Sequence, residues 1–248
     1  KKVSQVTFED CDAIHRHASK TAPTTANRAI AALRRSLNLA ITWGWIDRNP
    51  TKGLELNQER KVERFLSIEE IGRLLRALDD HPRKDSAEAI KVMLFTGCRR
   101  GEALSAKWDQ FDSEFRIWTK PASTTKQRRL HRVPVSAPVT ALLKSRRKRV
   151  KGDYVFPSHK GDTLKEVRRT WSGVLEEAKI EGVRLHDLRH TFASLAVSQG
   201  HSLPIIGAML GHSQTQTTAR YAHLFDDPLI ATTESVASII SGSRLKRP

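Results

Sequence analysis

The sequence predicts a mostly α-helical protein with a small antiparallel β-sheet, divided into a helical N-terminal unit and a larger mixed α/β unit. Three observations predict this fold class. Apolar residues recur at helical spacing through most of the chain. The main β-prone region consists of two short runs joined by a polar turn. A polar stretch at residues 49–66 separates the helical start of the chain from the rest.

The N-terminal unit is expected to be helical over residues 1–48. Thr24 or Thr25 can cap a helix whose apolar positions follow one face, namely Ile30, Leu33, Leu37 and Ile41. Gly44 and then Asn49-Pro50 end this helix. The polar stretch that follows, with a charged run at 59–64, is the predicted linker.

The second unit begins with a helix, because Ser67 and Glu70 form a capping box before an apolar stripe. A further helix ends near Gly97. Strands are predicted at 115–119 and 131–135, with a short strand at 154–156. The remaining sequence predicts helices at about 138–150, 163–180, 186–199, 203–210, 215–224 and 228–240.

The composition favours a folded protein that binds a polyanion. Of the 248 residues, 38% are hydrophobic and 28% charged, so a packed core is feasible. The chain has 43 Lys and Arg against 27 Asp and Glu, a net charge of +16. Nucleic acid is therefore the first partner to consider, although a ribosomal-type protein or an ordinary basic enzyme would show the same excess.

The cysteines and the hydropathy pattern indicate a cytoplasmic protein. Cys11 and Cys98 form no CxxC pair and no metal-ligand cluster, as expected for free thiols in a reducing compartment. No apolar run approaches the roughly 18 residues of a membrane span, and no signal-peptide pattern precedes the first helix. Because the chain starts at Lys1 rather than at Met, we expect a fragment of a longer protein.

Residues 96–102, TGCRRGE, form the first candidate site motif. One helix ends at Gly97 and another starts near Arg99, so Arg99 can grip a phosphate where backbone N–H groups already favour an anion. Glu102 lies three residues further on the same helical face and can orient the guanidinium. The alternative is an ordinary surface ion pair.

Residues 186–190, HDLRH, form the second motif. His186 and Arg189 share a helical face, where histidine can pass protons near neutral pH and arginine can grip phosphate with two fixed donors. The alternative is a partly buried helix start with solvated charges. A zinc site is not expected, since the pattern lacks the acid of HExxH.

Three further residues complete the candidate set. Gly211 suits a helix C-cap and leaves His212 at an exposed helix end, where a capping histidine is the alternative. Tyr221 can act as a nucleophile, although a buried tyrosine with a bonded hydroxyl is the more usual role. Lys126 lies in the turn between the two predicted strands, with a solvated lysine as the alternative and Lys120 as a rival position.

Together these residues fit cleavage of a phosphodiester. Two arginines can neutralise the non-bridging oxygens, a tyrosine can attack phosphorus, and a lysine and a histidine can donate and accept protons. This set needs no metal, and the sequence has no acidic cluster typical of two-metal nucleases. We therefore expect neither a metal nor another cofactor.

The sequence resembles the tyrosine recombinase (phage integrase) family through four motifs in matching order: TGCRRGE at 96–102, TKQRRLHRVPVS at 125–136, HDLRHTFAS at 186–194 and LGHSQTQTTARYAHL at 210–224. Residues 24–54 also resemble the helical core-binding domain of that family. The resemblance implies a DNA-binding core-binding domain at 1–58 and a mixed α/β catalytic domain, with a C-terminal helix, at 59–248.

The resemblance implies a role for each candidate residue. Arg99 and Arg189 clamp the scissile phosphate, and Tyr221 attacks it to form a 3′-phosphotyrosyl link and free a 5′-hydroxyl. Lys126 is implied as the general acid and His186 as a proton-transfer group. Two further residues, His212 and Glu102, are implied to bond a phosphate oxygen and to support the site. Outside the family's motif positions lie Arg100, His190 and His223.

The resemblance also implies the partners and the biological role. The expected partner is double-stranded DNA at a specific recombination site, held by a homo-tetramer without ATP. The helix at 227–241 is expected to dock on a neighbouring protomer or on its own domain. DNA contacts are expected from Arg28, Arg34 and Arg35, and a basic run at 144–151 is either a duplex-lining surface or a solvated face. The expected role is DNA integration or excision of a mobile element or viral genome.

Two alternatives remain at this stage. A non-catalytic helical DNA-binding protein would have no use for the six residues that carry the resemblance. A type IB topoisomerase shares the chemistry, but the separate helical N-terminal unit and the spacing of LGH to RY favour the recombinase.

Overall fold

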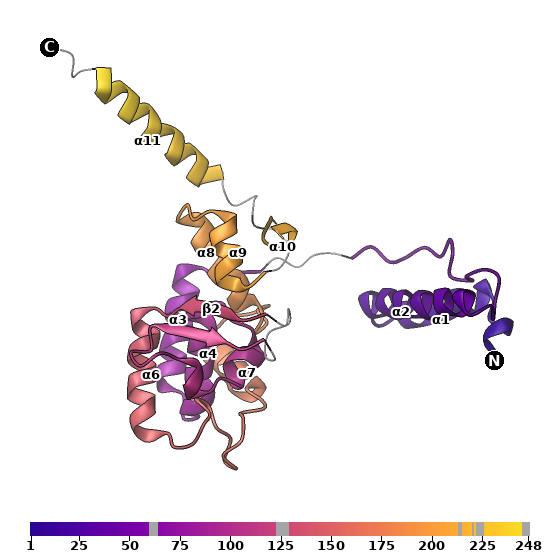
Figure 1. The fold of residues 1–248 in the computed structure, drawn as a ribbon, viewed down its shortest axis with the longest axis horizontal. Helices are drawn as coiled ribbons and strands as arrows, with labels where there is room; N and C mark the ends of the chain where they lie inside the picture. Colours follow the sequence, from indigo (N-terminus) through magenta and orange to yellow (C-terminus); the bar gives the residue numbers. More distant parts are fainter. Residues whose placement is uncertain (60–63, 123–128, 213–214, 220, 222–225, 245–248) are drawn as a thin grey trace. The chain divides into compact units, whose positions relative to one another are not determined.

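The computed structural model of the chain describes residues 1–59, 64–122, 129–212, 215–219, 221 and 226–244 (Figure 1). The chain forms two compact units, Lys1–Glu63 and Arg64–Pro248. The boundary falls within the polar stretch 49–66. The predicted fold class, mostly α with a small antiparallel sheet, is confirmed.

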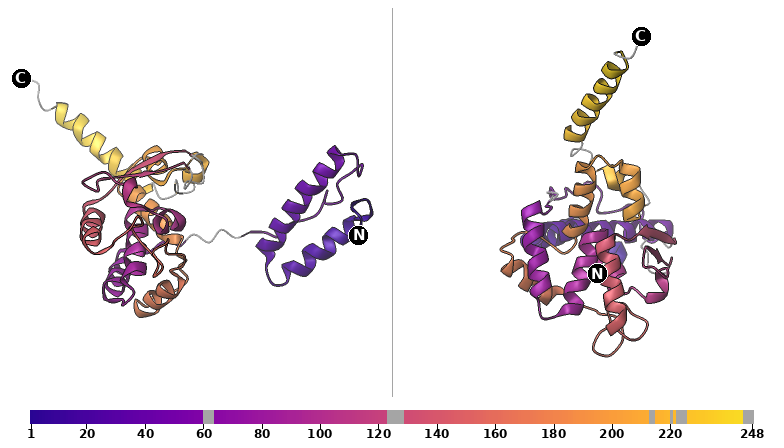
Figure 2. Two further views of the ribbon diagram at one scale, coloured as in Figure 1. Left: turned by 60° about the horizontal axis from the view of Figure 1, so that its bottom comes forward. Right: turned by 90° about the vertical axis from the view of Figure 1, so that its left-hand side faces the viewer.

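The N-terminal unit contains a 3₁₀ turn, Val3–Gln5, and two helices, α1 (Phe8–Ser19) and α2 (Pro23–Thr42), which lie side by side (Figure 2). Thr7 begins α1 by accepting a hydrogen bond from the backbone N–H of Asp10. A small core of Cys11, Ile30 and Leu54 joins the helices to the segment that follows. Gly44, with φ of 71°, lies two residues after the end of α2, as predicted.

The C-terminal unit is built around α4 (Lys84–Thr96), which packs against neighbours on several sides (Figure 1). These neighbours are α3 (Ile68–Asp80), α5 (Arg100–Leu104), α6 (Ala137–Arg149), α7 (Arg168–Glu177) and α8 (Asp187–Ser198). The capping box predicted at Ser67 and Glu70 starts α3, with the two residues exchanging side-chain to backbone hydrogen bonds. The main core runs between these helices, and Trp118 is the largest of its fully buried side chains.

The small sheet consists of β1 (Ile117–Lys120) and β2 (His131–Pro134), paired antiparallel with Ile117 opposite Pro134 and Lys120 opposite His131. The predicted first strand started two residues too early. Asp112 accepts hydrogen bonds from the backbone N–H groups of Arg116 and Ile117, which closes a turn in which Phe115 has φ of 55°. The short strand predicted at 154–156 is a single bridge between Tyr154 and Lys107 rather than a strand.

The helix predicted at 163–180 starts later than expected, at Arg168. Thr163 pairs instead with Pro157, and the backbone N–H of Leu164 donates to the carbonyl of Phe156. These bonds keep 163–164 extended. Glu166 then accepts from the backbone N–H groups at 167 and 168, which fixes the start of α7.

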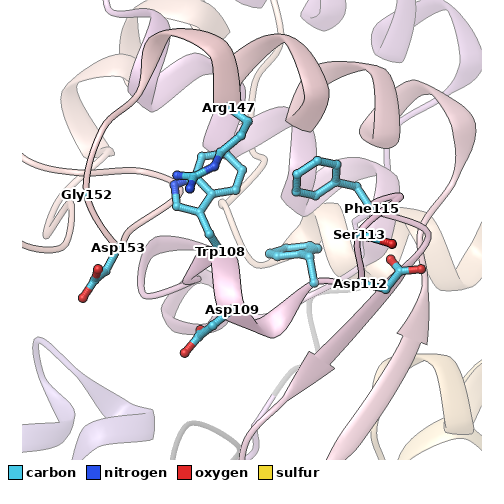
Figure 3. A pocket seen from close by; sticks show the side chains of 9 residues that line it. Trp108, Asp109, Asp112, Ser113, Phe115, Arg147, Gly152 and Asp153 are labelled. Atoms are coloured by element: carbon cyan, nitrogen blue, oxygen red, sulfur yellow. The ribbon is translucent and has the colours of Figure 1, made fainter.

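The basic run at 144–151 is not a uniform charged surface. Arg146 is completely buried, where it pairs with Asp85 and Glu88. Arg147 lies over the ring of Trp108, with the guanidinium carbon 5.1 Å from the ring centroid (Figure 3). Part of this run therefore holds α6 to the body of the unit.

The chain ends in α9 (Leu203–Leu210), α10 (Thr215–Ala219) and α11 (Asp226–Arg244). In α11 four apolar side chains are exposed by about half or more, namely Ile230, Val236, Ile239 and Ile240. No helix in the described part of the chain is long and apolar enough to cross a membrane.

Candidate active site

The first part of the site is the turn between α4 and α5. Gly97 ends α4 in the left-handed conformation, with φ of 62°, and Arg99 is the N-cap of α5. Glu102 accepts hydrogen bonds from the Arg99 backbone N–H at 3.2 Å and from its guanidinium at 2.9 Å. The predicted pairing of these two residues is therefore present, and it fixes the direction of the Arg99 side chain.

Glu102 is not a surface residue, because it also binds a buried lysine. Lys120 Nζ lies 2.8 Å from Glu102 Oε2, and both side chains are only 2% exposed. Burial opposes ionisation of Glu102, but the charge and hydrogen bond of Lys120, together with two hydrogen bonds from Arg99, hold its pKa below the usual value. Lys120 also lies over the ring of Trp118 at 4.3 Å. Lys120 thus supports Arg99 from inside the core.

Arg189 on α8 is the most constrained cation of the site. Its guanidinium donates to the carbonyl of Gly97 at 2.9 Å and to that of Leu210 at 2.7 Å, and the residue is 4% exposed. Burial, followed by the positive charge of Arg99, lowers the pKa of Arg189 to about 10. The two arginines are therefore close enough to repel each other, and an anion between them would relieve that repulsion.

His186 precedes α8 and lies within the field of the same cations. Although the residue keeps exposed surface, burial on its packed side, followed by the charge of Arg189, lowers its pKa from the usual 6.5. Both effects favour the neutral imidazole over the imidazolium. Its ring meets that of His190 edge to face, with centroids 5.2 Å apart.

Tyr221 lies in the turn after α10 and is 6% exposed, packed with Ala193, Val197, Ile206 and Leu210. Its hydroxyl oxygen lies 2.5 Å from Nδ1 of His190. His190 is not among the site residues predicted from the sequence, although its spacing, one helical turn after His186, places the two histidines on one helical face.

His212 follows the end of α9, where Gly211 takes the left-handed conformation predicted for a C-cap, with φ of 67°. The expected exposed position is not what the structure shows. His212 is partly buried, and its Nδ1 lies 2.8 Å from the hydroxyl of Thr218. This contact connects the end of α9 to α10. His212 lies two residues after Leu210, whose carbonyl accepts a hydrogen bond from Arg189.

The structure brings five predicted residues of the C-terminal unit into one region. Glu102 binds Arg99, the charges of Arg99 and Arg189 act on each other and on His186, and the Tyr221 hydroxyl contacts His190 next to Arg189. His212 contacts Thr218 and follows Leu210, whose carbonyl binds Arg189, by two residues. Lys126 lies outside the described residues. The three arginines predicted to contact DNA, Arg28, Arg34 and Arg35, lie on α2. Arg28 and Arg35 are exposed. Arg34 is partly buried and donates two hydrogen bonds to Thr51.

The two neighbouring arginines make the arrangement suited to an anion. In the described ranges, no group of three or more His, Cys, Asp or Glu side chains is placed to hold a metal ion. A separate cavity of about 500 Å³ beside Trp108 is lined by three aspartates and one arginine, namely Asp109, Asp112, Asp153 and Arg147 (Figure 3). None of the predicted site residues lines it.

Known proteins resemble the chain in sequence and in structure. The profile of the phage integrase family matches residues 64–227. The integrase of Haemophilus phage HP1 (strain HP1c1) is 31% identical over 204 residues, which are 80% of this chain and 56% of the phage protein. The integrase of Escherichia phage 186 is 28% identical over 215 residues, 85% of this chain and 59% of that protein. The chain therefore spans less than two thirds of either integrase.

The fold also has a solved counterpart. The Tn1549 transposon integrase, in complex with a circular intermediate DNA, superposes with a TM-score of 0.79. It is 17% identical, and the match covers 94% of this chain and 86% of that chain. At this identity the likeness concerns the fold.

Proposed function

This chain belongs to the phage integrase family, and we propose that it cleaves and rejoins DNA strands at a specific site through a covalent bond to Tyr221. The observation that carries the proposal is the pair Arg99 and Arg189, two neighbouring cations that the fold fixes through Glu102 and through main-chain carbonyls. The Tyr221 hydroxyl oxygen lies 2.5 Å from Nδ1 of His190, the residue that directly follows Arg189 on α8. A phosphodiester on the arginines would place its phosphorus near a tyrosine oxygen.

Each residue then has one task. Arg99 and Arg189 bind the non-bridging oxygens and stabilise the charge that builds up on them. Tyr221 attacks phosphorus, the bond to the 5′-oxygen breaks, and a 3′-phosphotyrosine forms. Lys126 supplies the proton to the leaving 5′-oxygen, and His212 donates to a phosphate oxygen. Because the phosphotyrosine keeps the energy of the broken bond, a new 5′-hydroxyl can reverse the step without ATP.

The proposed partners are double-stranded DNA and further copies of the chain. The related Tn1549 integrase has been solved with a circular intermediate DNA, which supports a DNA partner here. We propose a core-binding domain at 1–58, a catalytic domain at 59–248, and a homo-tetramer in which α11 docks on a neighbouring protomer. The exposed apolar residues of α11 support that docking. The buried free thiols fit a cytoplasmic, DNA-associated protein that integrates or excises a mobile element.

The N-terminal unit is proposed to contact DNA through α2. Arg28 and Arg35 can reach a phosphate, whereas Arg34 is engaged with Thr51. Replacement of Arg28 or Arg35 by glutamine should lower the slope of log affinity against log salt by about one for each phosphate that the protein no longer neutralises. An unchanged slope in both variants would place the DNA contacts elsewhere.

A trapping experiment tests the proposed reaction. The substrate is a nicked duplex carrying the end sequence of the element that encodes the chain, so that the short fragment bearing the new 5′-hydroxyl diffuses away. Wild-type protein should form an adduct with DNA that survives denaturant, and Tyr221→Phe should form none. Tyr154→Phe, which changes the chain's other tyrosine, should behave as wild type.

The outcome also separates the competing functions. If wild-type protein binds the site but leaves no adduct, the chain is a DNA-binding protein without this chemistry. If the adduct forms in Tyr221→Phe, another residue is the nucleophile. Chelator should leave adduct formation unchanged, because the proposed charge stabilisation comes from arginines; inhibition by EDTA would point to a metal instead.

A further inference from the structure

The contact between Tyr221 and His190 has no place in the roles described so far. His190 Nδ1 lies 2.5 Å from the Tyr221 hydroxyl oxygen, within hydrogen-bond distance, and the ring centroids are 5.9 Å apart. His190 lies on α8 directly after Arg189, whose side chain is fixed by two carbonyls. The proposed nucleophile, the Tyr221 hydroxyl oxygen, thus contacts an imidazole that can accept a proton. That imidazole lies on the same helix as Arg189.

The attacking phenol needs such a group. A tyrosine hydroxyl has an ordinary pKa of about 10, so at neutral pH its proton has to leave as the oxygen attacks. A general base must be within hydrogen-bond reach of that proton, directly or through one water. His190 meets this condition in the structure. The ring of His186, one turn earlier, lies perpendicular to that of His190, with the centroids 5.2 Å apart.

We propose that His190 is a catalytic residue, the general base that takes the phenolic proton of Tyr221, and returns it when the strands are rejoined. The inference rests on the proposed function. In the forward step the bond from Tyr221 Oη to phosphorus forms, the bond from phosphorus to the 5′-oxygen breaks, and the phenolic proton passes to His190 Nδ1. The leaving 5′-oxygen takes its proton from the proposed acid, Lys126. In the reverse step each proton retraces its path.

The surroundings of His190 suit a base that becomes positive during the reaction. Asp187, one turn earlier on α8, is completely buried. Burial opposes its ionisation, but hydrogen bonds from Arg184 hold the pKa of Asp187 below its usual value, and the charge of His190 contributes in the same direction. An ionised carboxylate beside His190 favours the imidazolium. The positive charge that forms on His190 would lie on the same helix as Arg189, and a bound phosphate would offset both charges.

The first test is the cleavage rate. His190→Asn keeps a hydrogen-bonding group near the position of Nδ1 but cannot take up a proton at neutral pH. Single-turnover adduct formation on the nicked substrate should fall by about 10²- to 10⁴-fold. His201→Asn, a change at an exposed histidine after α8, is the matched control and should keep the wild-type rate. Thermal unfolding of both variants shows whether each is folded.

The second test separates proton transfer from a structural effect. In a Tyr221→Phe background, DNA ending in a 3′-p-nitrophenyl phosphate can be joined to a 5′-hydroxyl strand by the rest of the site. The nitrophenolate leaves without a proton, so this joining should not depend on His190. Adding His190→Asn should therefore leave its rate unchanged, whereas adding Arg189→Gln should lower it.

Two results would contradict the role of His190, and a third would contradict the proposed function itself. A wild-type cleavage rate in His190→Asn shows that His190 is not the base. A parallel loss of cleavage and of activated joining shows that His190 only supports the structure of the site. If the wild-type protein itself forms no adduct, the proposed function fails first, which is a different outcome from loss in His190→Asn alone.

Discussion

Replacement of Gly97 by alanine should destabilise the C-terminal unit strongly. A Cβ at this position would lie 2.7 Å from Leu210 Cδ2 and 2.8 Å from Phe192 Cδ1, and the residue has φ of 62°. The left-handed conformation costs an L-residue roughly 1–2 kcal/mol. Overpacking a well-filled core costs typically about 1–3 kcal/mol more. We therefore expect the free energy of unfolding to fall by roughly 2–5 kcal/mol, measured by urea denaturation.

The same change should also disturb the phosphate clamp, because Arg189 binds the carbonyls of Gly97 and Leu210. Gly101→Ala is the matched control. Gly101 lies in α5 without a left-handed backbone, and a Cβ added there would meet no atom within 4 Å, so alanine should raise helix stability by up to about 1 kcal/mol. Equal urea midpoints for Gly97→Ala and the wild type would refute the packing argument.

Three further outcomes are expected. Inorganic phosphate at a hundredfold excess over its Kd should stabilise the protein by about 2.7 kcal/mol, seen as a higher Tm, because it would offset the repulsion between Arg189 and Arg99; a shift of equal size in Arg189→Gln would contradict this. Lys120→Met should cost up to about 3–5 kcal/mol in urea, with partial recovery when Glu102→Gln is added; no coupling would mean that the pair is unimportant. Folded His186 has a pKa below 6.5, so the unfolded chain binds more protons below that pH. Stability should therefore fall as pH drops below about 6.5, and a slope unchanged in His186→Gln would contradict the assignment.

The features that the sequence predicted well are local. Ser67 caps α3, and Gly97 and Gly211 end their helices, because a cap depends on a few neighbouring residues and on backbone conformations that favour glycine. The pairing of Arg99 with Glu102 also follows from spacing along one helical turn. The start of α7 was missed because it depends on how 157 and 163 pair, which apolar periodicity does not report.

The features that were missed depend on contacts between distant segments. Nothing local shows that Lys120 is buried against Glu102, 18 residues earlier in the chain. The contact of His190 with Tyr221 joins α8 to the turn after α10, across 31 residues. Arg146 looks like part of a solvated basic run, yet its partners Asp85 and Glu88 come from α4, so the tertiary fold rather than the composition decides its role.

The way Arg189 is held affects how the sequence can change over evolution. Its two acceptors are main-chain carbonyls, so a substitution that preserves the backbone path at Leu210 would leave the acceptor in place. At Gly97 the carbonyl is equally independent of side chain, but the conformation and close packing restrict the position to glycine. The residue type can therefore vary at position 210 but not at position 97. A survey of functional variants at 97 and 210 should find this asymmetry.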